Sequence, residues 1–298
     1  MSALTTESRL EKLFARGEFV VTAEIGPPKG AAADSVVAAV NAGKECCDAF
    51  NLTDNQSAVV RLASIAAAVQ VAPAHAAPAN IAGMIVFLDP GHQAAMADMG
   101  RQVPTGRGGT KDCQASGTST DDGYPEHTFT WDTTLKIRQL LAQYGVRTAM
   151  SRGDDAGPGP CVDARAQMAN ALQPNAIVSI HGDGGPATGR GFHVLYSSPP
   201  LNQVQAGPSV RFAQTMRDQL VAAGVPAANY IGTNGLDARS DIAGLNLAQY
   251  PSVLVECGNM KNPADSALMK TPEGQQKYAD AVVKGIVAFL ATQPARTA

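Results

Sequence analysis

From residue 84 onward, short apolar runs alternate with helical patterns, and this alternation limits the possible folds more than any other feature of the sequence. Strand-like runs lie at residues 84–88, 146–150, 176–181, 191–196 and 252–257. Helical patterns lie between and after them, at residues 127–143, 163–172, 208–223 and 273–291. Strands that alternate with helices form parallel sheets whose faces are covered by the helices. We therefore predict a three-layer α/β domain with a mostly parallel sheet flanked by helices over residues 84–298.

A shorter α/β pattern precedes this domain. Strand-like runs at 19–25 and 48–52 are each followed by a helical pattern, at 33–44 and 57–69. Such a βαβα segment has parallel strands, but two units bury too little apolar surface to make a complete domain. The stretch that follows is rich in Ala and Pro, which is typical of a linker. The predicted organisation is a partial segment over 1–70, a linker over 71–83 and a domain over 84–298.

Charge and composition exclude several classes of partner. The net charge is −3 and the chain has no block of Lys or Arg, so we expect no nucleic acid partner. It has no apolar run of about 18 residues, so we expect no membrane span. The first residues lack the apolar core of a signal peptide. An apolar stretch after Arg61 looks like the second half of one, but a helix and linker is the interpretation we prefer.

The cysteines argue against a thiolate metal site. The chain has five, and none of them forms a CxxC pair. Cys113 and Cys161 both lie in loop-like sequence. From the sequence alone, a disulfide between them and two free thiols are both open, because the outcome depends on whether the compartment is oxidising.

Three predicted strands end in residues that could bind a metal or move a proton. His92 follows the first strand in DPGH, His181 ends the run AIVSIH, and Glu256 ends the run SVLVE. Ligands of open parallel sheets gather at the carboxyl ends of the strands, so we expect these side chains to converge. Taken singly, His92 could be a turn residue and His181 a satisfied core histidine. A buried carboxylate such as Glu256 is costly unless it is paired or bound to a metal.

A fourth candidate, Glu126, stands directly before the first long helix of the domain. An acidic residue at the start of a helix usually has a structural role, because it interacts favourably with the helix macrodipole. His127, the neighbour of Glu126, is an alternative metal ligand.

These four segments resemble the zinc-dependent N-acetylmuramoyl-L-alanine amidases of the amidase-3 type. They are Asp89-Pro-Gly-His92, Glu126, Ser179-Ile-His-Gly-Asp183 and Val255-Glu-Cys-Gly258. The resemblance covers residues 84–292 and is greatest to the small, mycobacterial-type enzymes. It implies one Zn²⁺ per chain, held by His92, Glu126 and His181, with Glu256 as the acid–base carboxylate. A His₂Glu set that leaves room for water is a known catalytic zinc arrangement.

The resemblance also implies a substrate and a place of action. The substrate would be peptidoglycan, cut at the amide between N-acetylmuramic acid and L-alanine by a monomer acting outside the cytoplasmic membrane, in the periplasm or cell wall. The lack of a signal peptide pattern in the first residues leaves retention in the cytoplasm open. Gln93, Gly182 and Cys257 depart from the family pattern next to the ligand positions, which bears on substrate preference more than on the reaction. The polar stretch 93–124 is expected to shape or cover the cleft.

Other marked residues have structural interpretations that we prefer. Arg190, Arg239 and Asn259 could contact the substrate but are more typical of surface or structural positions. His193 alternates with apolar residues in GFHVLY, as a residue on a strand face does. Trp131 is expected to pack on the first helix of the domain.

Residues 9–69 resemble the start of methylenetetrahydrofolate reductase, a flavin-dependent (β/α)₈ barrel, and Glu24 matches that family's catalytic acid. Because a barrel cannot close on two strands, we expect neither flavin binding nor reductase activity. The remaining alternatives are another zinc peptidase or amide hydrolase, a silent cell-wall-binding protein, and a folate or flavin protein. An intact Glu256 argues against the silent binder, since binding alone needs no acid–base group.

Overall fold

The computed structural model describes residues 22–25, 49–52, 81–94 and 100–294. The chain divides into two compact units, residues 1–75 and 76–298. In the first unit, β1 (Thr22–Ile25) and β2 (Ala49–Leu52) pair in parallel, as the sequence predicts. The helices predicted at 33–44 and 57–69, and most of the predicted linker, lie outside the described residues, so those boundaries stay a prediction.

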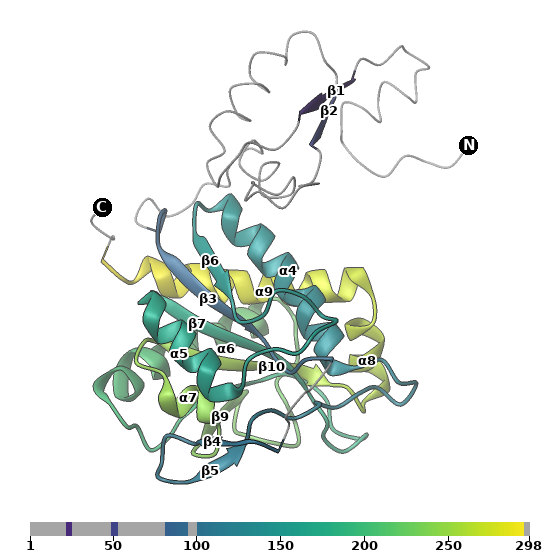
Figure 1. Ribbon diagram of the computed structural model, residues 1–298. Helices are drawn as coiled ribbons and strands as arrows, with labels where there is room; N and C mark the ends of the chain where they lie inside the picture. The colour runs from purple at the N-terminus through teal and green to yellow at the C-terminus, as the bar shows by residue number, and fades with distance from the viewer. Residues whose placement is uncertain (1–21, 26–48, 53–80, 95–99, 295–298) are drawn as a thin grey trace. The chain divides into compact units, whose positions relative to one another are not determined.

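The second unit is built on a six-stranded sheet with the order β6-β3-β7-β10-β8-β9 (Figure 1). Its strands are β3 (Ile85–Pro90), β6 (Arg147–Met150), β7 (Ala176–Asp183), β8 (His193–Ser197), β9 (Leu236–Arg239) and β10 (Ser252–Asn259). The four neighbours β6, β3, β7 and β10 pair in parallel. Strand β8 runs antiparallel to β10, and β9 is parallel to β8. The prediction of a mostly parallel sheet is therefore confirmed. A separate hairpin joins β4 (Gln102–Pro104) to β5 (Thr110–Asp112).

Helices cover both faces of this sheet. They are α4 (Glu126–Gln143), α5 (Val162–Leu172), α6 (Val210–Ala222), α7 (Ala243–Leu247), α8 (Pro263–Met269) and α9 (Pro272–Ala291). A π-helical turn, Gln205–Ser209, leads into α6. Figure 1 shows α4, α6 and α9 on one side of the sheet and α5 and α7 on the other. Within the described residues, no helix is both long and apolar enough to cross a membrane.

Successive side chains of a strand point to opposite faces of the sheet, so apolar residues of one strand contribute to the core on both faces. On β3, Val86 and Leu88 lie in the large core cluster with Phe129 of α4. Phe87, between them, faces the other way and packs with Ala169 of α5. Burying an apolar side chain of this size contributes about 1.5–3 kcal/mol. A strand buried on both faces is what the continuous apolar run at 84–88 predicts.

Some elements differ from the sequence-based expectation. The first helix begins at Glu126 itself and not after it, because Pro125 takes the N-cap position in an extended conformation. The hairpin β4–β5, the strand β9 and the short helices α7 and α8 are not predicted, since none of them carries an apolar run or a helical period long enough to register.

Candidate active site

Three of the predicted site residues converge at the carboxyl ends of β3 and β7. Potential ligand atoms of His92, Glu126 and His181 all lie within 4.8 Å of one another. Nε2 of His92 is 3.1 Å from Oε2 of Glu126, and Nδ1 of His181 is 3.0 Å from Oε1 of the same carboxylate. The loop after β3, the first turn of α4 and the end of β7 each supply one residue. A group of two imidazoles and one carboxylate could hold a divalent metal ion.

Main-chain groups orient the side chains of this cluster. Nδ1 of His92 lies 2.8 Å from the Ala115 carbonyl oxygen. A carbonyl only accepts, so Nδ1 carries a proton, and Nε2 is the ring nitrogen that faces the Glu126 carboxylate. The Glu126 carboxylate accepts hydrogen bonds from the backbone N–H groups of Thr118 (2.9 Å) and Gly182 (3.1 Å). Such hydrogen bonds from outside a metal site fix the tautomer and direction of its ligands.

Two glycines allow the cluster to be this compact. A Cβ on Gly91 would collide with the imidazole ring of His181. A Cβ on Gly117 would lie 2.7 Å from Oε2 of Glu126 and 2.9 Å from the His92 ring, and Gly117 has a φ of +78°. His92 itself has a φ of 61°, which is uncommon for a residue with a side chain. The loops on both sides of the cluster are therefore fitted closely to it.

The two histidines keep the Glu126 carboxylate negatively charged. Burial raises the pKa of Glu126, but hydrogen bonds with His181 and His92 outweigh this effect and hold the pKa well below its usual range. Burial lowers the pKa of His92, and its hydrogen bond to Glu126 outweighs that effect and raises it. The carboxylate is thus ionised at neutral pH, with imidazole nitrogens on both of its oxygens.

Glu256 stands beside this cluster on the same face of the sheet. It is the register partner of His181 on the parallel strand β7 and of His193 on the antiparallel strand β8. Its Oε2 is buried and has no hydrogen-bond partner among the described residues. Burial, followed by the nearby charges of Glu126 and Asp183, raises the pKa of Glu256 well above its usual value. A buried carboxyl group with a raised pKa is typical of an acid–base catalyst.

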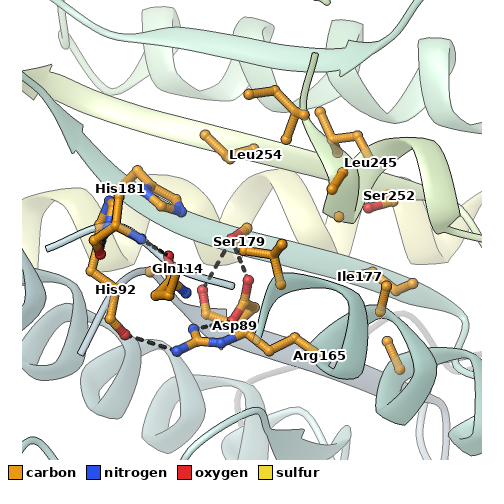
Figure 2. A pocket seen from close by; sticks show the side chains of 18 of the residues that line it. Asp89, His92, Gln114, Arg165, Ile177, Ser179, His181, Leu245, Ser252 and Leu254 are labelled. Carbon is orange, nitrogen blue, oxygen red and sulfur yellow. Dashed lines mark hydrogen bonds and ion pairs between the residues drawn. The ribbon is translucent and has the colours of Figure 1, made fainter. Parts of the chain in front are cut away.

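A pocket of about 470 Å³ opens from these residues along the sheet, on the side of α5 and α7 (Figure 2). His92, His181 and Glu256 line it together with Phe87, Ile177 and other apolar side chains. In Figure 2 the two histidines stand at one end of the view and Ile177 toward the other. The site can therefore receive a molecule that places an uncharged group against the sheet and a polar group at the histidines.

The buried residue Arg165 of α5 holds the loop that carries His92. Its Nη1 donates to Oδ1 of Asp89 (2.8 Å) and to the Pro90 carbonyl (2.8 Å). Its Nη2 donates to the His92 carbonyl (2.9 Å) and to Oε1 of Gln93 (2.9 Å). Burial raises the pKa of Asp89, but Arg165 and hydrogen bonds from two serines outweigh this and lower it to about 2. The role of Arg165 is not evident from the sequence, because an arginine on a helix is usually exposed.

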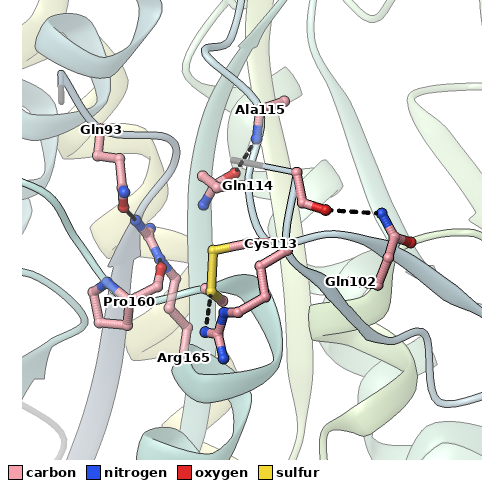
Figure 3. The surroundings of a disulfide bond; sticks show 10 residues. Gln93, Gln102, Cys113, Gln114, Ala115, Pro160 and Arg165 are labelled. Atoms are coloured by element: carbon pink, nitrogen blue, oxygen red, sulfur yellow. Dashed lines mark hydrogen bonds between the residues drawn. A yellow bond between two sulfur atoms is a disulfide. The ribbon is translucent and has the colours of Figure 1, made fainter. Parts of the chain in front are cut away.

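A disulfide attaches the polar stretch before α4 to α5. Cys113 is bonded to Cys161, the N-cap residue of α5 (Figure 3). Of the two alternatives left open by the sequence, the disulfide is the one that the structure contains. Lys111 and Asp112, on the last strand of the hairpin, line the pocket. The polar stretch therefore borders the site, as expected.

Hydrogen bonds attach the turn of the hairpin to α7 and to the end of β8. Arg107 donates to Oδ1 of Asn246 and Oγ of Ser197, both at 3.1 Å, and also contacts the Pro199 carbonyl. Asn246 in turn donates to the Thr105 carbonyl at 3.0 Å.

The other marked residues have structural partners. His127 pairs with Asp155 at 2.8 Å, and the group that could hold a metal contains Glu126 and not His127. The remaining candidates also have partners in the fold: Asn259 donates to the Pro186 carbonyl, Arg239 pairs with Asp237 and Asp241, Arg190 lies 3.5 Å from Asp265, and Trp131 packs under Arg152.

Comparison with known families decides the class of protein. The Amidase_3 family, described as N-acetylmuramoyl-L-alanine amidase, matches residues 86–288. The chain belongs to the N-acetylmuramoyl-L-alanine amidase family. All four motif segments lie inside the matched residues, and the expectation that the chain is an enzyme of this class is confirmed. The resemblance of residues 9–69 to methylenetetrahydrofolate reductase stays a prediction.

Individual amidases are similar to the chain over most of their length. The N-acetylmuramoyl-L-alanine amidase Rv3717 of Mycobacterium tuberculosis is 71% identical over 224 residues, which cover 75% of this chain and 93% of that protein. The crystal structure of Ami1 from Mycobacterium smegmatis is 75% identical with a TM-score of 0.72, covering 72% of this chain and all (100%) of that one. Ami1 from Mycobacterium abscessus gives 66% identity, a TM-score of 0.70 and coverage of 70% and 100%.

Proposed function

We propose that this amidase uses one Zn²⁺ to hydrolyse the amide bond between N-acetylmuramic acid and L-alanine in peptidoglycan. The observation that carries the proposal is the convergence of His92, Glu126 and His181. The family match supports the substrate class, since the related proteins are named for this bond. The identity of the metal, the roles of the individual residues and the monomeric state are part of the proposal.

The donor set suits zinc in kind and in number. Nε2 of His92, Nδ1 of His181 and the Glu126 carboxylate would hold the ion, and two histidines with one glutamate are a known catalytic zinc set. The Ala115 carbonyl holds a proton on Nδ1 of His92, so Nε2 is the nitrogen that would give up its proton and bind the metal. When bound, Zn²⁺ would supply a Lewis acid and lower the pKa of a coordinated water to about 7.

Glu256 would move the protons of the reaction. Its Oε2 has no partner among the described side chains, and Glu256 lines the pocket beside His181. The carboxylate can therefore accept a proton from the attacking water and deliver it to the nitrogen of L-alanine as the amide bond breaks. The protons balance, because the proton that Glu256 takes from the water ends on the amine product.

The lining of the pocket supports this choice of bond. The lactyl group and L-alanine each carry one methyl, and the apolar side chains of Ile177 and Leu254 line the sheet side of the pocket. Lys111 lies at the same pocket and would attract a carboxylate of the stem peptide. We propose that the apolar wall receives the methyl groups and that Lys111 favours an acidic stem.

The disulfide supports action outside the cytoplasm. Cys113 and Cys161 are bonded, and disulfides persist mainly in oxidising compartments. We infer that the enzyme works on the wall outside the cytoplasmic membrane. This can be tested by alkylating the free thiols in intact cells of the native host, before the cells are lysed in air. If Cys113 and Cys161 were both fully alkylated, the inference would be contradicted.

Metal analysis together with turnover tests the proposal. We expect about one zinc per chain, hydrolysis of muramoyl dipeptide, loss of turnover with excess chelator and recovery when Zn²⁺ is returned. Full turnover by zinc-free protein would overturn the metal assignment. Zinc-dependent cleavage elsewhere in the substrate would point to another amide hydrolase, and zinc without any cleavage would point to a wall-binding protein.

A further inference from the structure

The structure buries a histidine next to Glu256 that no step of the proposed reaction uses. His193 lies on β8 and is only 2% exposed. Its neighbours on the strand, Val194 and Leu195, are buried apolar residues. An apolar side chain in place of His193 would pack there without the cost of burying two ring nitrogens. The presence of an imidazole there calls for a partner.

The position of His193 on the sheet identifies that partner. His193 is the register partner of Glu256 across the antiparallel pair β8–β10, and Glu256 is the register partner of His181 across β10–β7. The side chains of His181, Glu256 and His193 therefore stand in one row on one face of the sheet. Directly opposed residues of an antiparallel pair have Cβ atoms about 4.5–5.5 Å apart, which is close enough for their side chains to interact.

Both members of the pair have a polar atom to spare. Nδ1 of His193 and Oε2 of Glu256 are each buried without a hydrogen-bond partner in the described part of the chain. Buried polar atoms of native proteins almost always have a partner, either in the protein or in an ordered water. Two orphaned atoms on directly opposed residues are complementary, because an imidazole N–H can donate and a carboxylate oxygen accepts.

The surroundings keep His193 in the form that can donate one proton and accept another. Burial lowers the pKa of His193, and the nearby carboxylates of Asp183 and Asp237 oppose this only in part, while Arg239 adds to it. The imidazole is therefore neutral at pH 7. The Tyr230 ring packs edge-on against it, with the ring centroids 6.1 Å apart, and limits its rotation.

We propose that His193 is a positioning residue for the amidase reaction, which holds the Glu256 carboxylate through one water bound between Nδ1 and Oε2, the two atoms that lack a partner among the described residues. This rests on the function proposed above, in which Glu256 transfers protons. His193 would hold the carboxylate at the angle from which it can serve the attacking water and the leaving nitrogen. Misplacing a catalytic group by about 1 Å can cost on the order of 100-fold in rate, so this orientation matters to kcat.

Three substitutions of His193 separate positioning from packing. His193→Phe keeps the ring and removes both nitrogens. His193→Asn places a polar atom near the position of Nδ1, and His193→Gln places one near Nε2. For each protein, kcat and KM on muramoyl dipeptide would be measured together with zinc content and thermal stability, beside the wild type and Glu256→Gln.

We expect His193→Phe to bind zinc and to be at least as stable as the wild type, with kcat lowered about 10- to 100-fold and KM changed less than about threefold. His193→Asn should recover most of kcat and His193→Gln should not. Wild-type kcat in His193→Phe, equal recovery by Gln and Asn, or rates that follow stability alone would overturn the proposal. If His193→Phe does not fold, the contrast between Asn and Gln decides.

The reference proteins keep this inference apart from the proposed function. A wild type that does not cut the substrate, or an active Glu256→Gln, would contradict the function itself. An active wild type and an inactive Glu256→Gln, combined with full activity in His193→Phe, would contradict only the role of His193.

Discussion

Glu256 lies directly across from His181, because the two are register partners on the parallel strands β10 and β7. The backbone ladder between these strands fixes the separation of the expected acid–base carboxylate and the expected metal ligand. Loops of any length can connect the two strands without changing this relation. The site is therefore built on the rigid part of the fold, while the loops around it decide what can enter.

The first prediction concerns Glu256 itself. Glu256→Gln keeps the shape of the side chain but cannot take a proton from water. We expect kcat to fall about 10²- to 10⁴-fold, the usual contribution of general acid–base catalysis, with zinc content unchanged. Glu273→Gln, an exposed position in the first turn of α9, is the matched control and should retain activity. Normal turnover in Glu256→Gln would refute the assignment.

Gly117 is predicted to matter for metal binding in a way that other loop glycines do not. Gly117→Ala would place a Cβ against Glu126 and His92. We expect zinc affinity to fall on the order of 10- to 100-fold, as it does when groups that orient metal ligands are disturbed. Gly123, with a φ of +89° and nothing within 4 Å of its Cβ position, is the control for backbone strain. Competition with a zinc chelator measures both, and an equal effect of Gly123→Ala would contradict the prediction.

Asp89 is predicted to make the free energy of unfolding depend on pH. Its pKa falls from 3.8 to about 2 on folding, so the charged form is stabilised by about 2 kcal/mol in the native state. Because the folded pKa is the lower one, this contribution is present above about pH 4 and is lost as the pH falls toward 2.

Urea unfolding of Asp89→Asn in the presence of chelator tests this. We expect the variant to be less stable than the wild type by about 2–4 kcal/mol at pH 7, since it also leaves Arg165 without its charged partner. The gap should narrow as the pH falls below 4. Asp121→Asn, at an exposed carboxylate, is the control and should change stability little. A gap that does not change with pH would show that Asp89 is not ionised in the folded protein.

Loss of the disulfide is predicted to destabilise the catalytic unit. Cys113 and Cys161 are separated by 48 residues, and closing a loop of that length removes about 4 kcal/mol of chain entropy from the unfolded state. Replacing both cysteines by serine should lower the free energy of unfolding by about 2–4 kcal/mol. Reductant should destabilise the wild type similarly and leave the variant unaffected. Equal stability with and without reductant would contradict the prediction.

The catalytic unit is predicted to be self-sufficient. A chain that begins at Ala77 should fold, bind zinc and retain its kcat, because the family match begins only at residue 86. Gel filtration, metal analysis and turnover of the shortened chain check this. Insoluble protein would show that the preceding residues contribute to the fold.

The sequence predicts those parts of the site that follow from regular structure. His181 and Glu256 end apolar strands, and the carboxyl ends of parallel strands lie at the same edge of a sheet. Glu126 needed the family pattern, because an acid at a helix N-terminus usually has a purely structural role. The roles of Ala115 and Arg165 could not be predicted, since a backbone carbonyl has no residue signature and a buried arginine looks like a surface one in sequence.

The missed elements have the same kind of explanation. The strand β9 has the sequence LDAR, which shows neither an apolar run nor a clear alternation. It is ordered by its pairing with β8 and not by its own pattern. The hairpin strands β4 and β5 have three residues each, and their position depends on Cys113 and on the contacts of Arg107. Tertiary contacts, which a single sequence does not display, determine these segments.

The measurement that tests the central claim most directly is the position of oxygen-18 in the products of muramoyl dipeptide cleaved in labelled water. If the zinc site and Glu256 direct water to the lactyl carbonyl, the label appears in the lactyl carboxylate of muramic acid and the peptide leaves with an unlabelled, free L-alanine amine. Both should vanish with chelator and in Glu256→Gln. Label in the carboxylate of L-alanine would show that a peptide bond is cut instead, and would contradict the proposed function.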